Sequence, residues 1–402
     1  MLIMEILKLL GGDLLDIANR IGTNCAKWDE TIKKYENPNI IPLTVADMDF
    51  KASEAIINSM VKYAKMGIYG YTNPSPKYLD LSQKWMKHQY KYEVDKDCIV
   101  FCPRIIQALS LVIQNFTKEN DDIMIMTPLY SPIQNAIKVN NRKIVENKLI
   151  YENGSFNIDF EDFENNLKSG VKFLVIVSPH NPTGKVLTKD EIERIISLCK
   201  KYDVLIFSDE VHADFVWDDN FVSFASFFSQ HDKLIVANSP SKTFNIPGLE
   251  ISNIIIENFE IREKFREILN QAGIHNPNYF SIPAIEAAYG DSYSWMLETK
   301  KYIKENMILI KNFFEEDLKG FKCSEIQGTF LLWISYKGLN ITEEELSNQF
   351  INQANVAVSL GSEFGDEGEG FFRINAAAPR ELILTTLDRI KNNIDWESIY
   401  EK

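Results

Sequence analysis

From about residue 98 onward, short apolar runs alternate with longer stretches that have a helical pattern. Runs that are apolar on consecutive residues are typical of strands buried on both faces, and strands alternating with helices indicate a parallel sheet wrapped by helices. The pattern therefore predicts an α/β fold with a large, mostly parallel sheet. Its expected strands are residues 98–101, 123–126, 173–177, 204–207, 234–237 and 251–256.

Two helices between these strands have recognisable starts. One is expected at residues 104–116, directly after the first strand. The other begins with a capping-box pattern at 188–191 and runs to about Lys201. This second helix would provide the crossover connection that two parallel strands require.

The pattern changes toward the C-terminal part of the chain. The expected elements there are a long, mostly helical segment at 282–318, a strand at 329–334, a helix at 343–354, an apolar run at 356–360 and a last helix at 379–394. They indicate a smaller α/β unit, which the first residues of the chain are expected to join in part, since these show no sheet pattern of their own. The predicted division is an N-terminal arm at 1–45, a large domain at 46–290 and a small domain at 291–402.

Composition narrows the choice of partners. Apolar residues make up 45% of the 402 positions, enough to bury a substantial core, and the formal net charge is -14. An acidic chain is a poor match for nucleic acids or anionic membranes, which leaves small molecules or proteins as partners. No apolar run approaches the roughly 20 residues that span a bilayer. The apolar start at 1–10 is interrupted by Glu5 and Lys8 and predicts an amphipathic helix or entry arm rather than a signal peptide.

The cysteine pattern indicates the compartment. Five cysteines are scattered along the chain and lack the paired spacing of zinc sites. We therefore expect reduced thiols in a cytoplasmic protein, with no bound metal.

Polar residues stand just after three of the predicted strands, where open α/β sheets bind their ligands. Lys242 lies among hydroxyl residues and could form a Schiff base with an aldehyde cofactor, although a solvated loop lysine would look the same. Asp209 follows a buried strand and needs a cation or donor, which a protonated pyridine nitrogen, a helix cap or a structural ion pair would each supply. Asn181 could donate its amide to a phenolate oxygen, but Asn-Pro-Thr-Gly is also a plain turn sequence.

The order of these three strand ends is more specific than any one of them. With them, the chain resembles the fold type I pyridoxal-phosphate (PLP) enzymes, and within these the aminotransferase-like carbon-sulfur lyases of the MalY/PatB cystathionine β-lyase type. The resemblance runs from about residue 22 to 390. Further matching segments are 27–29 (Lys-Trp-Asp), 45–50 (Val-Ala-Asp-Met-Asp-Phe), 67–72 (Gly-Ile-Tyr-Gly-Tyr-Thr), 179–182 (Pro-His-Asn-Pro), 241–245 (Ser-Lys-Thr-Phe-Asn) and 370–375 (Gly-Phe-Phe-Arg-Ile-Asn).

The resemblance implies a role for each residue around the cofactor ring. Lys242 would hold the cofactor and later move the Cα proton of the substrate, and Asp209 would pair with the pyridine nitrogen. Asn181 would bind the ring oxygen. His212 falls where many relatives outside this branch carry a tyrosine near that oxygen, and Tyr130 matches the aromatic residue that stacks on the ring.

The same resemblance implies how the substrate and a second subunit are engaged. Arg373 matches the guanidinium that takes the α-carboxylate of an amino acid as a bidentate pair. Trp28 and Asp47 are expected to line the substrate site. Tyr71 matches a residue that reaches the phosphate of the neighbouring subunit, which implies a homodimer with shared active sites.

The expected phosphate site departs from the wider superfamily. Many relatives carry an arginine eight residues after the lysine, where this chain has Glu250. We hypothesise that Arg104 helps to neutralise the phosphate, together with the amides of Arg104 and Ile105 at a helix start. Ser239 and Ser241 would add hydroxyls. The alternative is that Arg104 is an ordinary surface residue.

Three functions follow from this resemblance. A β-lyase would convert cystathionine or cysteine-type amino acids to thiol, pyruvate and ammonia. An aminotransferase would use the same residues but need a 2-oxo acid acceptor. In a third reading, of another class, the protein is a PLP-binding partner of a regulatory protein.

Overall fold

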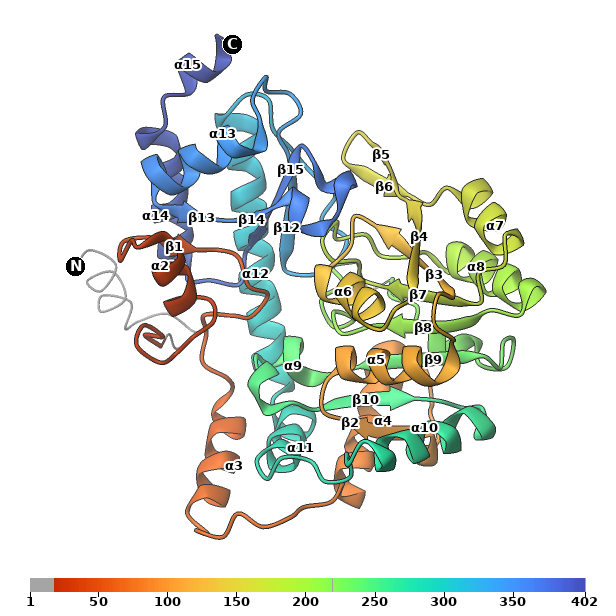
Figure 1. The fold of residues 1–402 in the computed structure, drawn as a ribbon. Coiled ribbons are helices and arrows are strands. Elements are labelled where there is room, and N and C mark those ends of the chain that lie inside the picture. The colour runs from red at the N-terminus through yellow and green to blue at the C-terminus, as the bar shows by residue number, and fades with distance from the viewer. Residues whose placement is uncertain (1–17, 219, 402) are drawn as a thin grey trace.

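The computed structural model describes residues 18–218 and 220–401 (Figure 1). The segment predicted to be an amphipathic helix or arm, residues 1–10, lies outside this part. A large sheet wrapped by helices forms one side of the molecule, and a smaller sheet lies beside the upper part of the long helix α12 (Tyr293–Asn312) (Figure 1).

The large sheet has seven strands in the order β2-β10-β9-β8-β7-β3-β4, and all of its neighbours are parallel except at β10, which is antiparallel to β2 and β9. The prediction of a mostly parallel sheet is therefore confirmed. Its strands are β2 (Ile99–Cys102), β3 (Asp122–Thr127), β4 (Lys143–Lys148), β7 (Phe173–Val177), β8 (Leu205–Asp209), β9 (Leu234–Asn238) and β10 (Ser252–Ile255).

Alternate residues of the strands serve two hydrophobic clusters, one on each face of the sheet. On β3, Ile123 and Ile125 belong to one cluster, whereas Met124 and Met126 belong to the other. The first face is covered by α5 (Ile105–Phe116), α6 (Ser131–Val139) and α10 (Phe259–Gln271). The second is covered by α4 (Pro76–Tyr90), α7 (Phe160–Lys168), α8 (Lys189–Tyr202) and α11 (Ser281–Asp291). Helices thus exclude water from both faces of the sheet, which is why most of its strands are apolar on consecutive residues.

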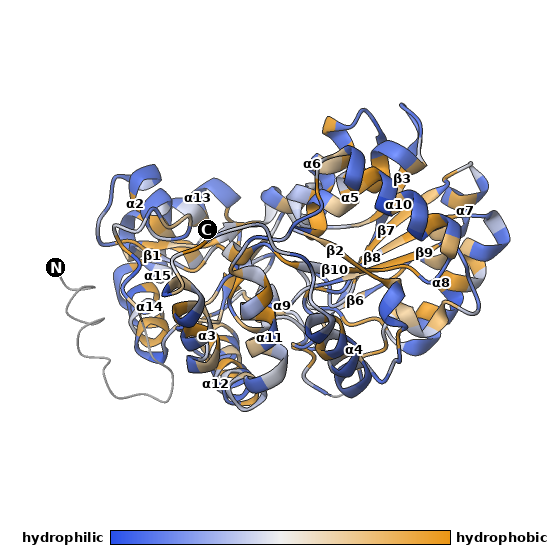
Figure 2. Cartoon of the chain, turned by 90° about the horizontal axis from the view of Figure 1, so that it is seen from below, coloured by the Kyte–Doolittle hydropathy of each residue, from blue (hydrophilic) through white to orange (hydrophobic). Residues whose placement is uncertain are grey.

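Figure 2 shows the same distribution, with hydrophobic residues concentrated on the central strands and hydrophilic residues on the outer sides of the helices. The predicted capping box at the start of α8 is present, since Thr188 accepts from the Glu191 amide and Glu191 accepts from the Thr188 amide. Among the described residues, none of the helices combines the length and the apolar character needed to cross a bilayer.

The smaller sheet is antiparallel, in the order β11-β12-β15-β14. Its strands are β11 (Lys322–Cys323), β12 (Leu331–Ser335), β15 (Phe371–Asn375) and β14 (Ser359–Leu360). Helices α14 (Arg380–Asn393) and α15 (Trp396–Tyr400) follow in the chain.

A two-stranded parallel sheet links the beginning of the chain to this region. In it β1 (Ile41–Pro42) pairs with β13 (Val356–Ala357). Cys25, Trp28 and other residues of the early chain share one hydrophobic cluster with residues of β12, β15 and α14. The boundaries at residues 45 and 290 remain a prediction.

Two expected elements differ from the observed ones. The run at 356–360 forms two short strands, β13 and β14, that belong to different sheets. The helix expected at 343–354 is α13 (Glu343–Asn348) followed by a π-helical segment, Gln349–Ala354. Further elements are the helices α2 (Asp29–Tyr35) and α3 (Glu54–Ala64) in the early chain, and a hairpin after β4 that consists of β5 (Ile150–Glu152) and β6 (Ser155–Asn157).

Candidate active site

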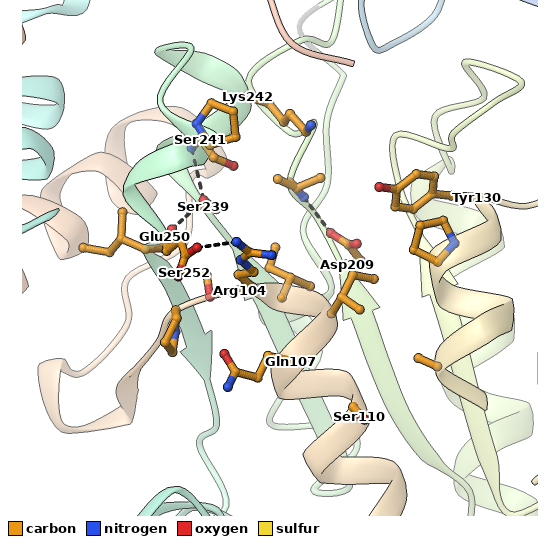
Figure 3. A pocket seen from close by; sticks show the side chains of 18 of the residues that line it. Arg104, Gln107, Ser110, Tyr130, Asp209, Ser239, Ser241, Lys242, Glu250 and Ser252 are labelled. Carbon is orange, nitrogen blue, oxygen red and sulfur yellow. Dashed lines mark hydrogen bonds and ion pairs between the residues drawn. The ribbon is translucent and has the colours of Figure 1, made fainter. Parts of the chain in front are cut away.

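A cavity of about 970 Å³ opens where β8 and β9 end and α5 begins. Because β2, β8 and β9 run in the same direction, their carboxyl ends lie at one edge of the sheet, and β10 starts at that edge. Figure 3 shows the side chains that line the cavity. They include Arg104, Gln107, Ser110, Tyr130, Asp209, Ser239, Ser241, Lys242, Glu250 and Ser252.

Lys242 reaches the cavity from α9 (Pro240–Thr243), a short helix that directly follows β9. Pro240 occupies the first turn and Ser239 caps the helix by accepting from the Ser241 amide at 3.1 Å. The lysine Nζ donates to the backbone oxygen of Ala46 at 2.7 Å. Burial lowers the pKa of Lys242 to about 8, against the opposing effect of Asp47. A larger fraction of the amine is therefore neutral and nucleophilic near physiological pH than for an exposed lysine.

Asp209 is the last residue of β8 and is 7% exposed. Its carboxylate accepts from the Val211 amide at 3.1 Å, and among the residues that the structure describes no cation forms an ion pair with it. Burial raises the pKa of Asp209 to about 6, partly offset by the Val211 amide and the charge of Lys242. In Figure 3 the Asp209 carboxylate, the Lys242 amine and the Tyr130 hydroxyl point toward one another. The cavity thus contains a buried acid that lacks a cationic partner.

Arg373 lies on β15 and is buried. Its guanidinium donates to Asn181 Oδ1 at 2.8 Å, to the Thr44 oxygen at 2.8 Å and to Ser359 Oγ at 3.1 Å. These acceptors are all neutral, and the arginine Nε has no partner in the described part of the chain. Burial lowers the pKa of Arg373 to about 10. A buried guanidinium without a carboxylate partner is suited to bind one from a ligand.

Tyr130 and His212 complete the group around Asp209. Tyr130 stands at the start of α6, half-buried, and burial raises the pKa of its hydroxyl while the charge of Arg373 opposes this. His212 is buried against Phe330, its Nδ1 has no partner among the described residues, and burial holds its pKa well below the usual range. His212 is therefore neutral at pH 7 and can act as a hydrogen-bond donor or acceptor.

The outer end of the cavity lies against the start of α5. No side chain caps this helix, whose N-cap position is Arg104, so the amide of Ile105 and those after it are free to bind an anion. Ser239 Oγ donates to the Ile251 oxygen at 2.7 Å, so its proton is already used. The Arg104 guanidinium is ion-paired with Glu250. The residues predicted to hold a phosphate are thus together, but Arg104 already has a partner.

Six of the predicted site residues are not among those that line this cavity: Asn181, His212 and Arg373, which lie in the neighbouring structure described above, and Tyr71, Trp28 and Asp47. Tyr71 is 96% exposed on the connection between α3 and α4. Trp28 is 2% exposed and its Nε1 donates to Asp49 at 2.9 Å rather than facing open space. Asp47 is paired with Arg20, although its charge acts on Lys242. Their predicted roles remain predictions.

Several residues that hold the site together had no role assigned from the sequence. Asn245 accepts from the Met48 amide at 3.0 Å and donates to the oxygens of Met48 and Phe50 at 3.0 and 2.7 Å. Its φ of 55° is a left-handed conformation, which asparagine adopts more readily than most residues. Asn245 therefore fixes the segment that offers Ala46 to Lys242. An asparagine shortly after a turn was the only sequence signal for this role.

Asp49 is a second such residue. It is buried with Lys27, whose Nζ lies 2.6 Å from its carboxylate, and with Arg20 at 2.8 Å. The cations lower the pKa of Asp49 despite its burial. This charged cluster holds the early chain next to the segment that ends at Phe50.

Comparison with known proteins defines the class. Residues 38–390 match the family model described as aminotransferase class I and II, and the chain belongs to that family. Its architecture is the type I fold of the PLP-dependent transferases, so the family resemblance expected from the motifs is confirmed.

Particular relatives are similar over nearly the whole chain. Cystathionine beta-lyase PatB of Bacillus subtilis (strain 168) is 34% identical over 92% of this chain and 97% of that protein. Protein MalY of Escherichia coli (strain K12) is 30% identical over 92% of this chain and 95% of its own length. The crystal structure of cystalysin from Treponema denticola, which contains a pyridoxal 5'-phosphate cofactor, has a TM-score of 0.91 at 34% identity and covers 95% of this chain and 98% of that chain.

Proposed function

We propose that this protein is a PLP-dependent carbon-sulfur β-lyase that converts cystathionine or cysteine-type amino acids to a thiol, pyruvate and ammonia. The observation that carries the proposal is the cavity in which the Lys242 amine faces the Asp209 carboxylate, in a chain that is 34% identical to a cystathionine beta-lyase. Arg373, a buried guanidinium whose acceptors in the described part of the chain are neutral, adds a place for the amino-acid carboxylate.

The residues of the cavity fit PLP. Lys242 offers an amine of lowered pKa to an aldehyde, Asp209 is a buried acid that a pyridinium N–H would satisfy, and the uncapped start of α5 offers amides to a phosphate. When bound, PLP supplies an electron sink that stabilises negative charge at the Cα of an amino acid.

The side chains of this protein then divide the work. Arg373 binds and orients the α-carboxylate, with Asn181 holding the guanidinium from the large sheet. Lys242 Nζ takes the Cα proton as a general base, which its pKa near 8 favours. Asp209 would pair with the protonated ring nitrogen of the cofactor. The Cβ–S bond breaks, the sulfur leaves with its electron pair and gains a proton, and water releases pyruvate and ammonia.

The test is to incubate the PLP-loaded protein with cystathionine and no 2-oxo acid. We expect pyruvate and a thiol to form, and we expect Lys242→Ala to lower the rate by roughly 10²–10⁴-fold or more. The absorbance of the bound cofactor reports loading independently of turnover. Transamination that requires an added 2-oxo acid, without pyruvate formation, would instead identify an aminotransferase.

We also propose that the active unit is a homodimer in which Tyr71 of each subunit reaches the phosphate held by the other. The proposal is supported by the exposure of neighbouring large apolar side chains, Met66, Ile68 and Tyr69. A cluster of this kind on a surface is typical of an interface. We further propose a cytoplasmic location, because the described cysteines are all free thiols.

A further inference from the structure

The cation nearest the start of α5 is neutralised before any ligand arrives. Arg104 and Glu250 form an ion pair, and both side chains line the cavity (Figure 3). Their side chains are 66% and 41% exposed. An anion that approaches the free amides of α5 therefore meets a carboxylate as well as a guanidinium.

The pairing of β2 with β10 creates this arrangement. Cys102 at the end of β2 lies opposite Ser252 at the start of β10, and Ser252 Oγ donates to the Cys102 oxygen at 2.7 Å. Arg104 follows the one strand and Glu250 precedes the other, so the two side chains meet across the cavity edge. Glu250 has a φ of 54°, a left-handed conformation that is uncommon for glutamate. The long Arg104 side chain is the more exposed of the two and can change partner.

Charge is scarce along the rest of the cavity. Of its lining residues, Arg104 and Lys242 are the cations and Asp209 and Glu250 are the acids. Lys242 lies beside Asp209 at the inner end (Figure 3). Arg104 is consequently the cation that can serve an anion bound at α5.

We propose that Glu250 competes with the phosphate of the cofactor for Arg104, so that the cofactor binds through an exchange of ion-pair partners and is held less tightly than it would be without Glu250. This inference rests on the proposed function. An exposed ion pair is weak, so Arg104 can leave Glu250 at little cost. A phosphate carries nearly two negative charges and attracts the guanidinium more strongly than one carboxylate does.

The experiment measures the Kd of pyridoxal 5'-phosphate by titration of apoprotein, using the absorbance of the bound cofactor. We expect Glu250→Gln to tighten binding by about three- to tenfold at low salt, and the gain to shrink at high salt because exposed charges are screened. Arg104→Ala should weaken binding by about tenfold. In the Arg104→Ala background, Glu250→Gln should have little effect, since no partner remains to compete for.

Two further probes identify the group that is recognised. Pyridoxal, which lacks the phosphate, should bind the Glu250→Gln variant and the unmodified protein equally. Inorganic phosphate should compete with pyridoxal 5'-phosphate for the apoprotein, with an inhibition constant that falls by about the same factor as Kd when Glu250 is replaced. Glu263→Gln, which removes the acid of an exposed pair with Arg266 on α10, is the matched control and should leave Kd unchanged.

The inference is overturned if Kd of the Glu250→Gln variant stays within twofold of the original while the cofactor attaches to Lys242. It is equally overturned if Glu250→Gln tightens binding as much in the Arg104→Ala background. Either result leaves the proposed function standing. Failure of the unmodified protein to bind the cofactor would overturn the proposed function as well.

Discussion

Asp209 is buried and Lys242 is partly buried, and both have pKa values shifted toward the neutral form. Their charged forms therefore destabilise the cofactor-free chain. Residues whose charge is needed for ligand binding commonly lower the free energy of unfolding of the ligand-free protein. Replacing such a group by a neutral one should therefore raise the free energy of unfolding. The same replacement should weaken ligand binding.

Asp209→Asn should show this trade-off. Because the folded-state pKa is raised from 3.8 to about 6, the stability linked to the protonated acid is full below pH 4 and is lost as pH rises to about 6. The cofactor-free variant should therefore be more stable than the original by about 1–3 kcal/mol at pH 7.5, and similar to it at pH 4. Chemical unfolding at the two pH values measures this, and a cofactor titration should show weaker binding.

Glu210→Gln is the matched control. Glu210 is the next residue, also buried, and burial raises its pKa to about 7, but its carboxylate is bound by Ser223, Ser208 and the Phe224 amide away from the cavity lining. Its replacement should leave the cofactor Kd unchanged. Equal loss of cofactor binding in both variants would show that Asp209 has no direct part in binding.

Single site residues could be predicted where a polar or charged side chain stands close to an apolar, buried strand. An acid at the end of a buried strand, Asp209, and an amide and a lysine a few residues after two others, Asn181 and Lys242, stand out in the sequence because they are polar groups close to apolar runs. The pairing of Arg104 with Glu250 was not predictable, since it depends on the left-handed backbone at Glu250 and on the antiparallel direction of β10.

At the scale of elements, the short helical loop Gly361–Phe364 joins the small sheet to α6. The Phe364 oxygen accepts from the Leu129 amide at 2.8 Å, and Gln134 Nε2 donates to the oxygens of Leu129 and Phe364 at 2.8 and 3.0 Å. The guanidinium carbon of Arg373 lies over the Phe364 ring, 4.8 Å from the ring centroid. Gln134 thus links the start of α6, where Tyr130 lies, to the arginine expected to bind substrate.

Gln134→Leu should loosen this link. Loss of two buried hydrogen bonds should lower the free energy of unfolding by about 1–3 kcal/mol, and KM for the amino acid should rise more than kcat falls, because Arg373 loses its support. Denaturant unfolding and steady-state kinetics measure the two effects. Gln114→Leu on α5, where the exposed Gln114 amide pairs with Asn140, should change stability by less than about 0.5 kcal/mol. A KM unchanged in Gln134→Leu would contradict the link.

Elements were predictable in proportion to their burial. Five of the six strands predicted for the large sheet are apolar on consecutive residues, the exception being 251–256, and each is found within a residue or two of its expected place. β4 was missed because it lies at the sheet edge and its sequence, Lys-Ile-Val-Glu-Asn-Lys, is largely polar. The two strands within 356–360 could not be separated in advance, since the sequence does not show that the first half pairs with β1 and the second half with β15.

At the scale of the whole molecule, the proposed dimer makes a prediction about mixed subunits. Lys242→Ala and Tyr71→Ala proteins should each be nearly inactive, but hybrids formed by co-expression contain one site with both original residues. Random pairing should restore about a quarter of the original activity per site. Different affinity tags on the two variants allow the hybrid to be isolated, and activity that stays at the level of the separate variants would contradict sharing of sites.

The pairing of β1 with β13 also has a consequence for how the protein is made. Synthesis from the N-terminus completes the large sheet at Ile255, but Ile41 must wait for Val356. Until then Cys25, Trp28 and Leu43 lack most residues of their own cluster, which lie beyond residue 300. Contacts between distant parts of a chain form late and leave hydrophobic segments exposed until then. We therefore expect the apolar side chains of this early segment to stay partly exposed on the nascent chain until the last helices are made.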